Sequence, residues 1–222
     1  MTALRHSRTR LIGLVLLLAL VVAMLLNTKF LTPQALANIG PKPFDPAQTA
    51  ATLFTKAQTD VASKGKPLTE VLPAVQADIK GAAAKYGAVS PAENSYVFAV
   101  TATGIVGDVT TADDIRLQIT GLPAGSTILV PTTAAINGTV LRDAMGFKFA
   151  EAPGQTQFQY VGDELKKLMQ GKVVAPAGDP TKLKGKTVTV TGVIGITASP
   201  GSNTVPTAKP VNIQPVKIEV AS

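Results

Sequence analysis

The sequence predicts an α+β protein with an N-terminal transmembrane helix, an α-hairpin, and then a small OB-like antiparallel β-barrel with one inserted helix. Three observations predict this class. An uncharged apolar run comes first, two segments with helical spacing of apolar residues follow, and short strand-like runs between Gly and Asp turns fill the rest. With 222 residues, the chain has room for one domain, or at most two small ones.

Residues 11–26 form an uncharged run of 16 apolar or small residues. As a helix the run extends ~24 Å, which is shorter than the ~30 Å hydrocarbon core, and snorkelling and local thinning absorb the difference. Three arginines precede the run and only Lys29 follows closely, which places the N-terminus in the cytoplasm. We therefore expect a cytoplasmic basic tail over 1–10, a single-pass inner-membrane anchor over 11–29, and a periplasmic or extracytoplasmic body.

A cleaved signal peptide is the alternative. Ala35-Leu36-Ala37 forms an A-x-A cleavage site before Asn38. The site lies 11 residues past the apolar run, Lys29 interrupts the interval, and the run is longer than a usual signal core. These features favour the uncleaved anchor, and both alternatives export residues 38–222.

The net charge of +7 is mainly a topology signal. Residues 1–29 hold four of the 21 basic residues and none of the 14 acidic residues, which leaves the body with a net charge of +3. Aromatic residues make up 5% of the chain, and none lies between the lysines at 182, 184 and 186. Single-strand binders need aromatic stacking surfaces, so we expect no nucleic-acid partner.

The composition also excludes several chemistries. The chain has no cysteine, which excludes disulfides, cysteine nucleophiles, Cys-based zinc sites and a lipid linked to a lipobox cysteine. Its one histidine, His6, precedes the apolar run, which argues against a Ser-His-Asp hydrolase. The acidic residues 108, 113 and 114 do not fit a calcium loop and indicate a turn. We expect no enzymatic activity, metal or cofactor.

After a linker over 30–44, an α-hairpin is expected over 45–87. Asp45 is a candidate N-cap and Pro46 suits the first helical position. The second helix is expected to begin near Thr69, to kink at Gly81 and to end at Gly87. Each helix has one apolar stripe, which needs a partner surface on the C-terminal body.

Residues 95–222 are predicted to form a small barrel. A loop is expected over 137–145 and a helix over 161–170. Strands are expected at 96–101, 106–109, 115–119, 127–130, 147–149, 187–194 and 213–220. About five or six short strands with one interrupting helix fit the five-stranded oligonucleotide/oligosaccharide-binding (OB) barrel best.

The densest polar cluster lies in the expected loop. One hypothesis makes it a ligand site, in which Arg142 binds a carboxylate or phosphate and Asn137, Thr139 and Asp143 donate or accept hydrogen bonds. The alternative is a structured connection, in which Gly138 supplies an unusual dihedral and the charged residues satisfy backbone groups or form one buried pair.

These residues resemble a bacterial family of predicted periplasmic lipoproteins of unknown function. The Gly-Thr-x-Leu-Arg-Asp-Ala stretch is the most specific part of the resemblance. The matching segments are 27–30, 44–46, 84–87, 137–144 with Phe147 and Phe149, 183–186, and 215–219.

The resemblance implies an accessory role in uptake, since such proteins are often associated with sugar ABC-transport systems. It implies no activity and no functional residues. The absence of cysteine departs from a lipoprotein, so residues 11–26 must hold this chain to the membrane if anything does. The sequence therefore predicts a non-enzymatic adaptor or binding module; a direct binder of a carbohydrate or anion near Arg142 and an oligonucleotide-binding barrel are the alternatives.

Overall fold

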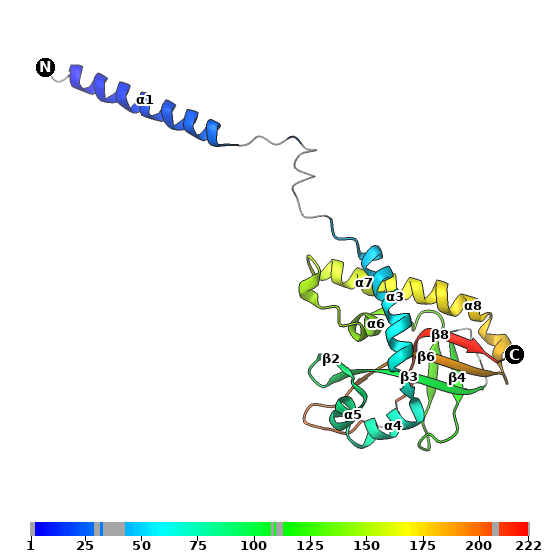
Figure 1. Ribbon diagram of the computed structural model, residues 1–222. Coiled ribbons are helices and arrows are strands. Elements are labelled where there is room, and N and C mark those ends of the chain that lie inside the picture. The colour runs from blue at the N-terminus through cyan, green and yellow to red at the C-terminus, as the bar shows by residue number, and fades with distance from the viewer. Residues whose placement is uncertain are drawn as a thin grey trace. The chain divides into compact units, whose positions relative to one another are not determined.

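The computed structural model describes residues 3–28, 32, 43–107, 109, 113–205 and 209–221. The chain divides into two units, residues 1–43 and 44–222 (Figure 1). In the first unit, the described residues include helix α1 (Ala3–Asn27). Most of the expected linker and the Ala35-Leu36-Ala37 site lie outside the described residues.

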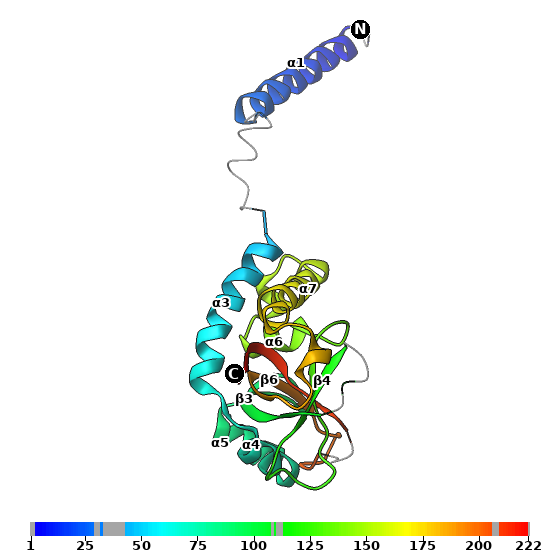
Figure 2. The same cartoon turned by 90° about the vertical axis from the view of Figure 1, so that its right-hand side faces the viewer.

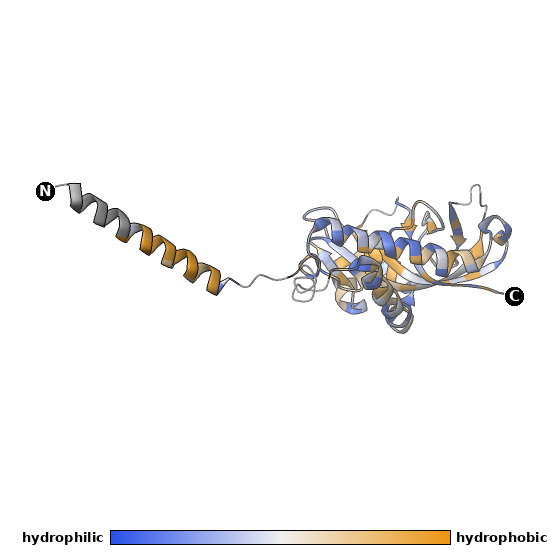
Figure 3. Ribbon diagram, turned by 90° about the horizontal axis from the view of Figure 1, so that it is seen from above, coloured by the Kyte–Doolittle hydropathy of each residue, from blue (hydrophilic) through white to orange (hydrophobic). Residues whose placement is uncertain are grey.

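Helix α1 exposes large apolar side chains along its length, from Ile12 at 59% to Leu26 at 82% (Figure 3). Within the described part of the chain, no helix combines the length and the apolar content that crossing a membrane requires. The expected helix is therefore present, and its role as a membrane anchor stays a prediction.

The second unit is built on one sheet whose strands follow the order β7-β5-β4-β3-β6-β8. The long strands β3 (Ser95–Val106) and β6 (Thr187–Thr197) pair antiparallel along 11 residues. The remaining members are β1 (Lys66–Pro67), β2 (Val89–Ala92), β4 (Asp114–Gln118), β5 (Ile128–Pro131), β7 (Val211–Asn212) and β8 (Gln214–Val220).

The two ends of this strand path come together. Only Ile213 separates β7 from β8, and its amide donates to the Leu129 carbonyl of β5 at 2.8 Å. Strand β5 pairs parallel with β7, whereas β8 pairs antiparallel with β6. The strands therefore form an open sheet whose two ends approach each other, and its pairing is mixed, whereas the sequence predicted an antiparallel barrel.

Both faces of β3 and β6 are buried, because neighbouring residues point to opposite sides of a strand. Side chains on one face, such as Phe98 and Val190, belong to one buried apolar cluster, which we call the inner core. Side chains on the other face, such as Val97 and Val193, belong to a second cluster, the outer core. Helices α4 (Leu68–Ala77) and α5 (Ile79–Tyr86) fill the inner core, while α3 (Pro46–Lys64) and α7 (Gln155–Met169) cover the outer face (Figures 1 and 2).

The α-hairpin prediction is wrong in its packing. Helix α3 begins as expected, with Asp45 Oδ1 accepting from the amides of Ala47 at 2.9 Å and Gln48 at 3.1 Å. Its apolar face packs in the outer core, whereas that of α4 packs in the inner core. The short strand β1 lies between the two helices in the chain and pairs with β3. Each helix therefore packs against the sheet, and the two helices do not pack against each other as a hairpin would.

The second expected helix is two helices. The break falls at Asp78, whose backbone is extended and whose side chain accepts from the amide of Lys80 at 3.2 Å. The kink expected at Gly81 is therefore wrong in position. A side-chain cap on the backbone, three residues earlier, sets the change of direction.

The segment between β5 and β6 contains more helix than expected. The expected loop over 137–145 is helix α6 (Gly138–Ala144), and the strand expected at 147–149 is replaced by the turn η1 (Phe149–Glu151). Helix α7 begins six residues before the expected start at 161 and continues into η2 (Gln170–Val174), α8 (Ala175–Ala177) and η3 (Pro180–Leu183). Strand β3 extends the strand expected at 96–101 as far as Val106, so the separate strand expected at 106–109 is wrong apart from its first residue, with residue 108 outside the described residues.

Candidate functional site

Helix α6 carries the predicted site residues, and Asn137 fixes its start. The Asn137 side chain accepts from the Thr139 amide at 3.0 Å, as an N-cap does. The Asn137 amide donates to Gln214 Oε1 of β8 at 2.8 Å. Asn137 therefore positions α6 against the barrel, and it lines neither of the two pockets described below.

Gly138 lets α6 approach α7 closely. A Cβ at Gly138 would lie 2.0 Å from the Gly162 carbonyl oxygen and 2.6 Å from the Lys166 amide nitrogen. Both neighbours are backbone atoms, so no side-chain rotation could relieve the overlap. Gly138 is absent from the glycines with positive φ, so the expected unusual dihedral is wrong and close helix packing explains the residue.

Arg142 is buried, with 7% of its side chain exposed, and its donors are engaged inside the protein. Its Nε and Nη2 donate to Asp143 Oδ1 at 3.0 and 2.8 Å, and its Nη1 donates to the Phe158 carbonyl at 3.1 Å. The guanidinium carbon lies 3.6 Å from the centroid of the Phe158 ring. Arg142 thus ties α6 to α7 and holds the Asp143 carboxylate in one orientation.

Four phenylalanines surround this ion pair. The rings of Phe44 and Phe158 stack on Phe147, with centroid distances of 6.4 and 5.8 Å. Phe149 meets Phe158 edge-on at 5.7 Å and an angle of 80°. Phe149 remains 55% exposed, so the cluster presents an aromatic surface to solvent.

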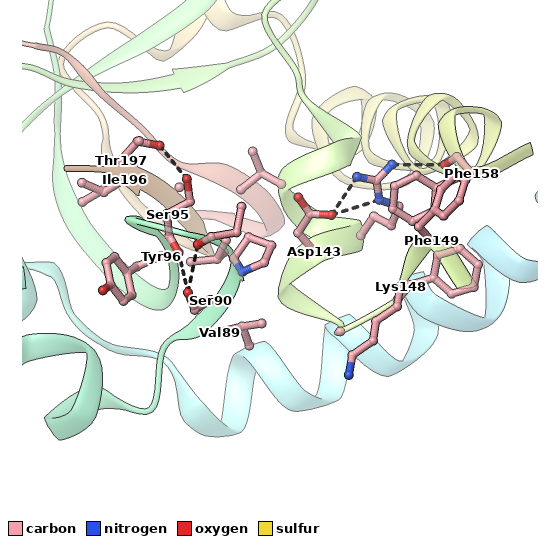
Figure 4. Close-up of a pocket in the computed structure, with 18 residues that line it drawn as sticks. Val89, Ser90, Ser95, Tyr96, Asp143, Lys148, Phe149, Phe158, Ile196 and Thr197 are labelled. Carbon is pink, nitrogen blue, oxygen red and sulfur yellow. Dashed lines mark hydrogen bonds and ion pairs between the residues drawn. The ribbon is translucent and has the colours of Figure 1, made fainter. Parts of the chain in front are cut away.

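Two pockets flank this cluster. The Asp143 pocket, of about 570 Å³, lies between β2, the start of β3, the end of α6 and the end of β6 (Figure 4). The Thr139 pocket, of about 420 Å³, lies on the α7 side and includes Gln155 and Gln159. Arg142, Phe149 and Phe158 line both pockets. The structure therefore brings three of the four predicted residues, Thr139, Arg142 and Asp143, around one aromatic cluster.

The sequence interpretation missed the aromatic part of this site. Phe44, Phe147, Phe149 and Phe158 lie on a segment before α3, a loop, a turn and a helix, so no periodic pattern joins them. The only available signal was the spacing of Phe147 and Phe149 just after the polar cluster, and we interpreted it as strand alternation.

The described residues offer no metal centre: no three His, Cys, Asp or Glu side chains gather there to hold an ion. Among the described residues, Asp179 and Lys167 have shifted pKa values, and both lie outside the two pockets. Hydrogen bonds from Thr181 lower the pKa of Asp179, and the hydrogen bond and charge of Glu164 raise the pKa of Lys167. Both groups are fully exposed, so these shifts reflect surface pairs.

The sequence pattern of a family described as "Predicted periplasmic lipoprotein (DUF2291)" matches residues 15–215. The chain belongs to this family. The match spans both units and includes all the site residues described above. The resemblance deduced from the sequence is thus confirmed, and the link to sugar ABC transport is outside what the family description states.

A solved structure has a similar fold. An OB-fold protein from Thermotoga maritima, known from a crystal structure, is similar with a TM-score of 0.65 and 19% sequence identity. The alignment covers 81% of this chain and 100% of the other. At this identity the similarity establishes the fold alone, an α+β protein with an OB-like sheet. No curated protein sequence matches this DUF2291 member.

Proposed function

We propose that this DUF2291 protein is an extracytoplasmic, non-enzymatic binding and accessory protein, held at the inner membrane by residues 11–26 and serving a sugar ABC-transport system. The family description supports the extracytoplasmic location. The Asp143 pocket carries the binding part of the proposal, since it joins a fixed carboxylate to an exposed aromatic ring.

The anchor has its own test. A C-terminally tagged chain is followed by blotting, together with a variant in which Ala35 and Ala37 are replaced by bulky residues. Retention of the full mass in the membrane fraction after carbonate extraction is expected. Loss of roughly 4 kDa, abolished in the variant, would replace the anchor by a cleaved signal peptide and leave export intact.

The accessory role predicts a stable partner in the envelope. The tagged protein, extracted with mild detergent, should co-purify with a transporter subunit. A Phe149→Ala variant tests the exposed ring, and Tyr160→Ala is the matched control, because Tyr160 is an aromatic residue of similar exposure on α7 outside both pockets. Recovery of no envelope component would contradict the accessory role.

A second candidate is direct binding of a carbohydrate or an anionic small molecule near Arg142. The Asp143 pocket favours it, since about 570 Å³ falls within the range of roughly 300–1,000 Å³ usual for ligand pockets. The geometry changes the role of Arg142, because its largely buried guanidinium already donates three hydrogen bonds inside the protein and positions Asp143.

The oligonucleotide alternative has less support. OB folds that bind nucleic acid use the face of their second and third strands, with aromatic side chains for stacking. Here these strands are β4 and β5, whose sequences, DIRLQ and ILVP, contain no aromatic residue.

A further inference from the structure

The Asp143 pocket is lined by two cationic side chains and one carboxylate, and their arrangement decides which charge a ligand meets. Arg142 and Lys148 are the cationic residues among those lining it. Three donor atoms of Arg142 already serve Asp143 and Phe158. Figure 4 shows the Lys148 ammonium directed away from Asp143, so the carboxylate is the charge that a ligand near α6 would meet.

The polar groups on the opposite wall also present acceptors. Ser90 Oγ donates towards the carbonyls of Ala92 and Ser95, at 3.1 and 3.0 Å, and the hydroxyls of Ser95 and Thr197 pair with each other at 3.1 Å. Asp143, as a carboxylate, only accepts hydrogen bonds, and 21% of its side chain is exposed. A ligand that pairs with Asp143 must therefore bring hydrogen-bond donors of its own, and the Ser90, Ser95 and Thr197 hydroxyls add further lone pairs.

Phe149 supplies the apolar contact. Phe158 is already engaged, since the Arg142 guanidinium lies 3.6 Å from its ring centroid and the Phe147 ring stacks on it at 5.8 Å. Phe149 touches Phe158 only edge-on and keeps 55% of its surface exposed. An apolar ring face with hydroxyl groups at its rim would cover Phe149 and reach Asp143.

We propose that the Asp143 pocket binds an uncharged, hydroxyl-rich ring compound, a neutral saccharide, with Asp143 accepting from its hydroxyls and Phe149 stacking on its C–H face. The inference rests on the proposed function, in which this pocket is a ligand site. It makes Asp143 and Phe149 the contact residues, and Arg142 a positioning residue that fixes the carboxylate.

The test uses the full chain in lipid nanodiscs, because maltoside detergents would compete. Glucose, galactose, ribose and maltose are titrated by calorimetry against glucuronate and glucose 6-phosphate, and saturation-transfer NMR reports contact with aromatic protons. At least one neutral sugar should bind. Asp143→Asn should weaken it by at least roughly ten-fold, the loss expected for one charge-assisted hydrogen bond, and Phe149→Ala by roughly two- to ten-fold, the loss expected for one stacking contact. Tyr160→Ala should bind as the unaltered protein does.

Asp143→Asn removes the charge that pairs with buried Arg142, so its thermal melt must be recorded as well. Phe149→Ala alters a half-exposed ring and gives an independent answer if the first variant is unstable. Preference for the two anions would overturn the saccharide inference and leave a ligand-binding function in place. Binding of none of the six compounds would overturn the inference, while capture of a transporter partner would still support the accessory role.

Discussion

Replacing Arg142 by Ala should destabilise the protein strongly. The side chain is 7% exposed and donates at 3.0 and 2.8 Å to Asp143 and at 3.1 Å to the Phe158 carbonyl. The substitution removes these donors and leaves space above the Phe158 ring. Of the two hypotheses drawn from the sequence, the ligand site predicts loss of binding with an unchanged melting temperature, whereas the structured connection predicts this loss of stability.

The size of the effect follows from the burial of the ion pair. Removing one partner of a buried pair costs about 3–5 kcal/mol. The 21% exposure of Asp143 lets water solvate the remaining carboxylate, which puts the expected loss near the lower limit, at about 3 kcal/mol. In a body of this size, about 1 kcal/mol lowers Tm by 2–4 °C, so a fall of about 6–12 °C is expected.

Thermal and urea unfolding followed by circular dichroism would measure this loss. Arg142→Lys keeps the charge but not the forked geometry, so its Tm should lie between those of the unaltered protein and of Arg142→Ala. Arg116→Ala is the control, because Arg116 is exposed on β4 and its removal should leave Tm nearly unchanged. A Tm for Arg142→Ala no lower than that of Arg116→Ala would refute the positioning role.

Two smaller effects should be measurable at surface caps. Asp78→Ala should lower the free energy of unfolding by about 1 kcal/mol, the usual value of an N-cap, whereas Asp78→Asn should preserve it because Asn also caps helices. Equal urea midpoints for the two variants would contradict a capping role of Asp78. The pKa of Asp179 is lowered by its hydrogen bonds to Thr181, so its stabilising contribution is present at neutral pH and is lost as the pH falls through the folded-state pKa. Carboxyl NMR titration should show the pKa of Asp179 rising in Thr181→Ala, and an unchanged midpoint would contradict this cause.

Local signals predicted some elements well. Asp45 followed by Pro46 specifies a helix start within three residues, and α3 begins there. The run from Thr187 is rich in β-branched residues on both faces, and β6 begins at that residue. Each of these features depends on neighbours in the sequence, so the chain itself contains the information.

The elements that the sequence did not predict depend on distant contacts. Helix α6 has only seven residues, too few to be stable alone, and is held by Gln214 of β8 and by close packing of Gly138 on Gly162. The sequence identified Arg142 and Asp143 as a polar cluster, but the Phe158 carbonyl decides the role of Arg142. The position of that carbonyl, 16 residues away, depends on where α7 packs.

The close contact of α6 with α7 leads to one more prediction, which links packing to the candidate site. Gly138→Ala would place a Cβ 2.0 Å from the Gly162 carbonyl oxygen, so α6 must move away from α7. Since α6 carries Arg142, the bond to Phe158 should break, and a loss of more than about 3 kcal/mol, the upper part of the usual range for overpacking, is expected. Gly171→Ala is the matched control, because a Cβ there meets no atom within 4 Å, and its stability should be unchanged or slightly raised. Equal urea midpoints for the two variants would show that α6 can shift freely, and Asp143 could then not be a fixed acceptor.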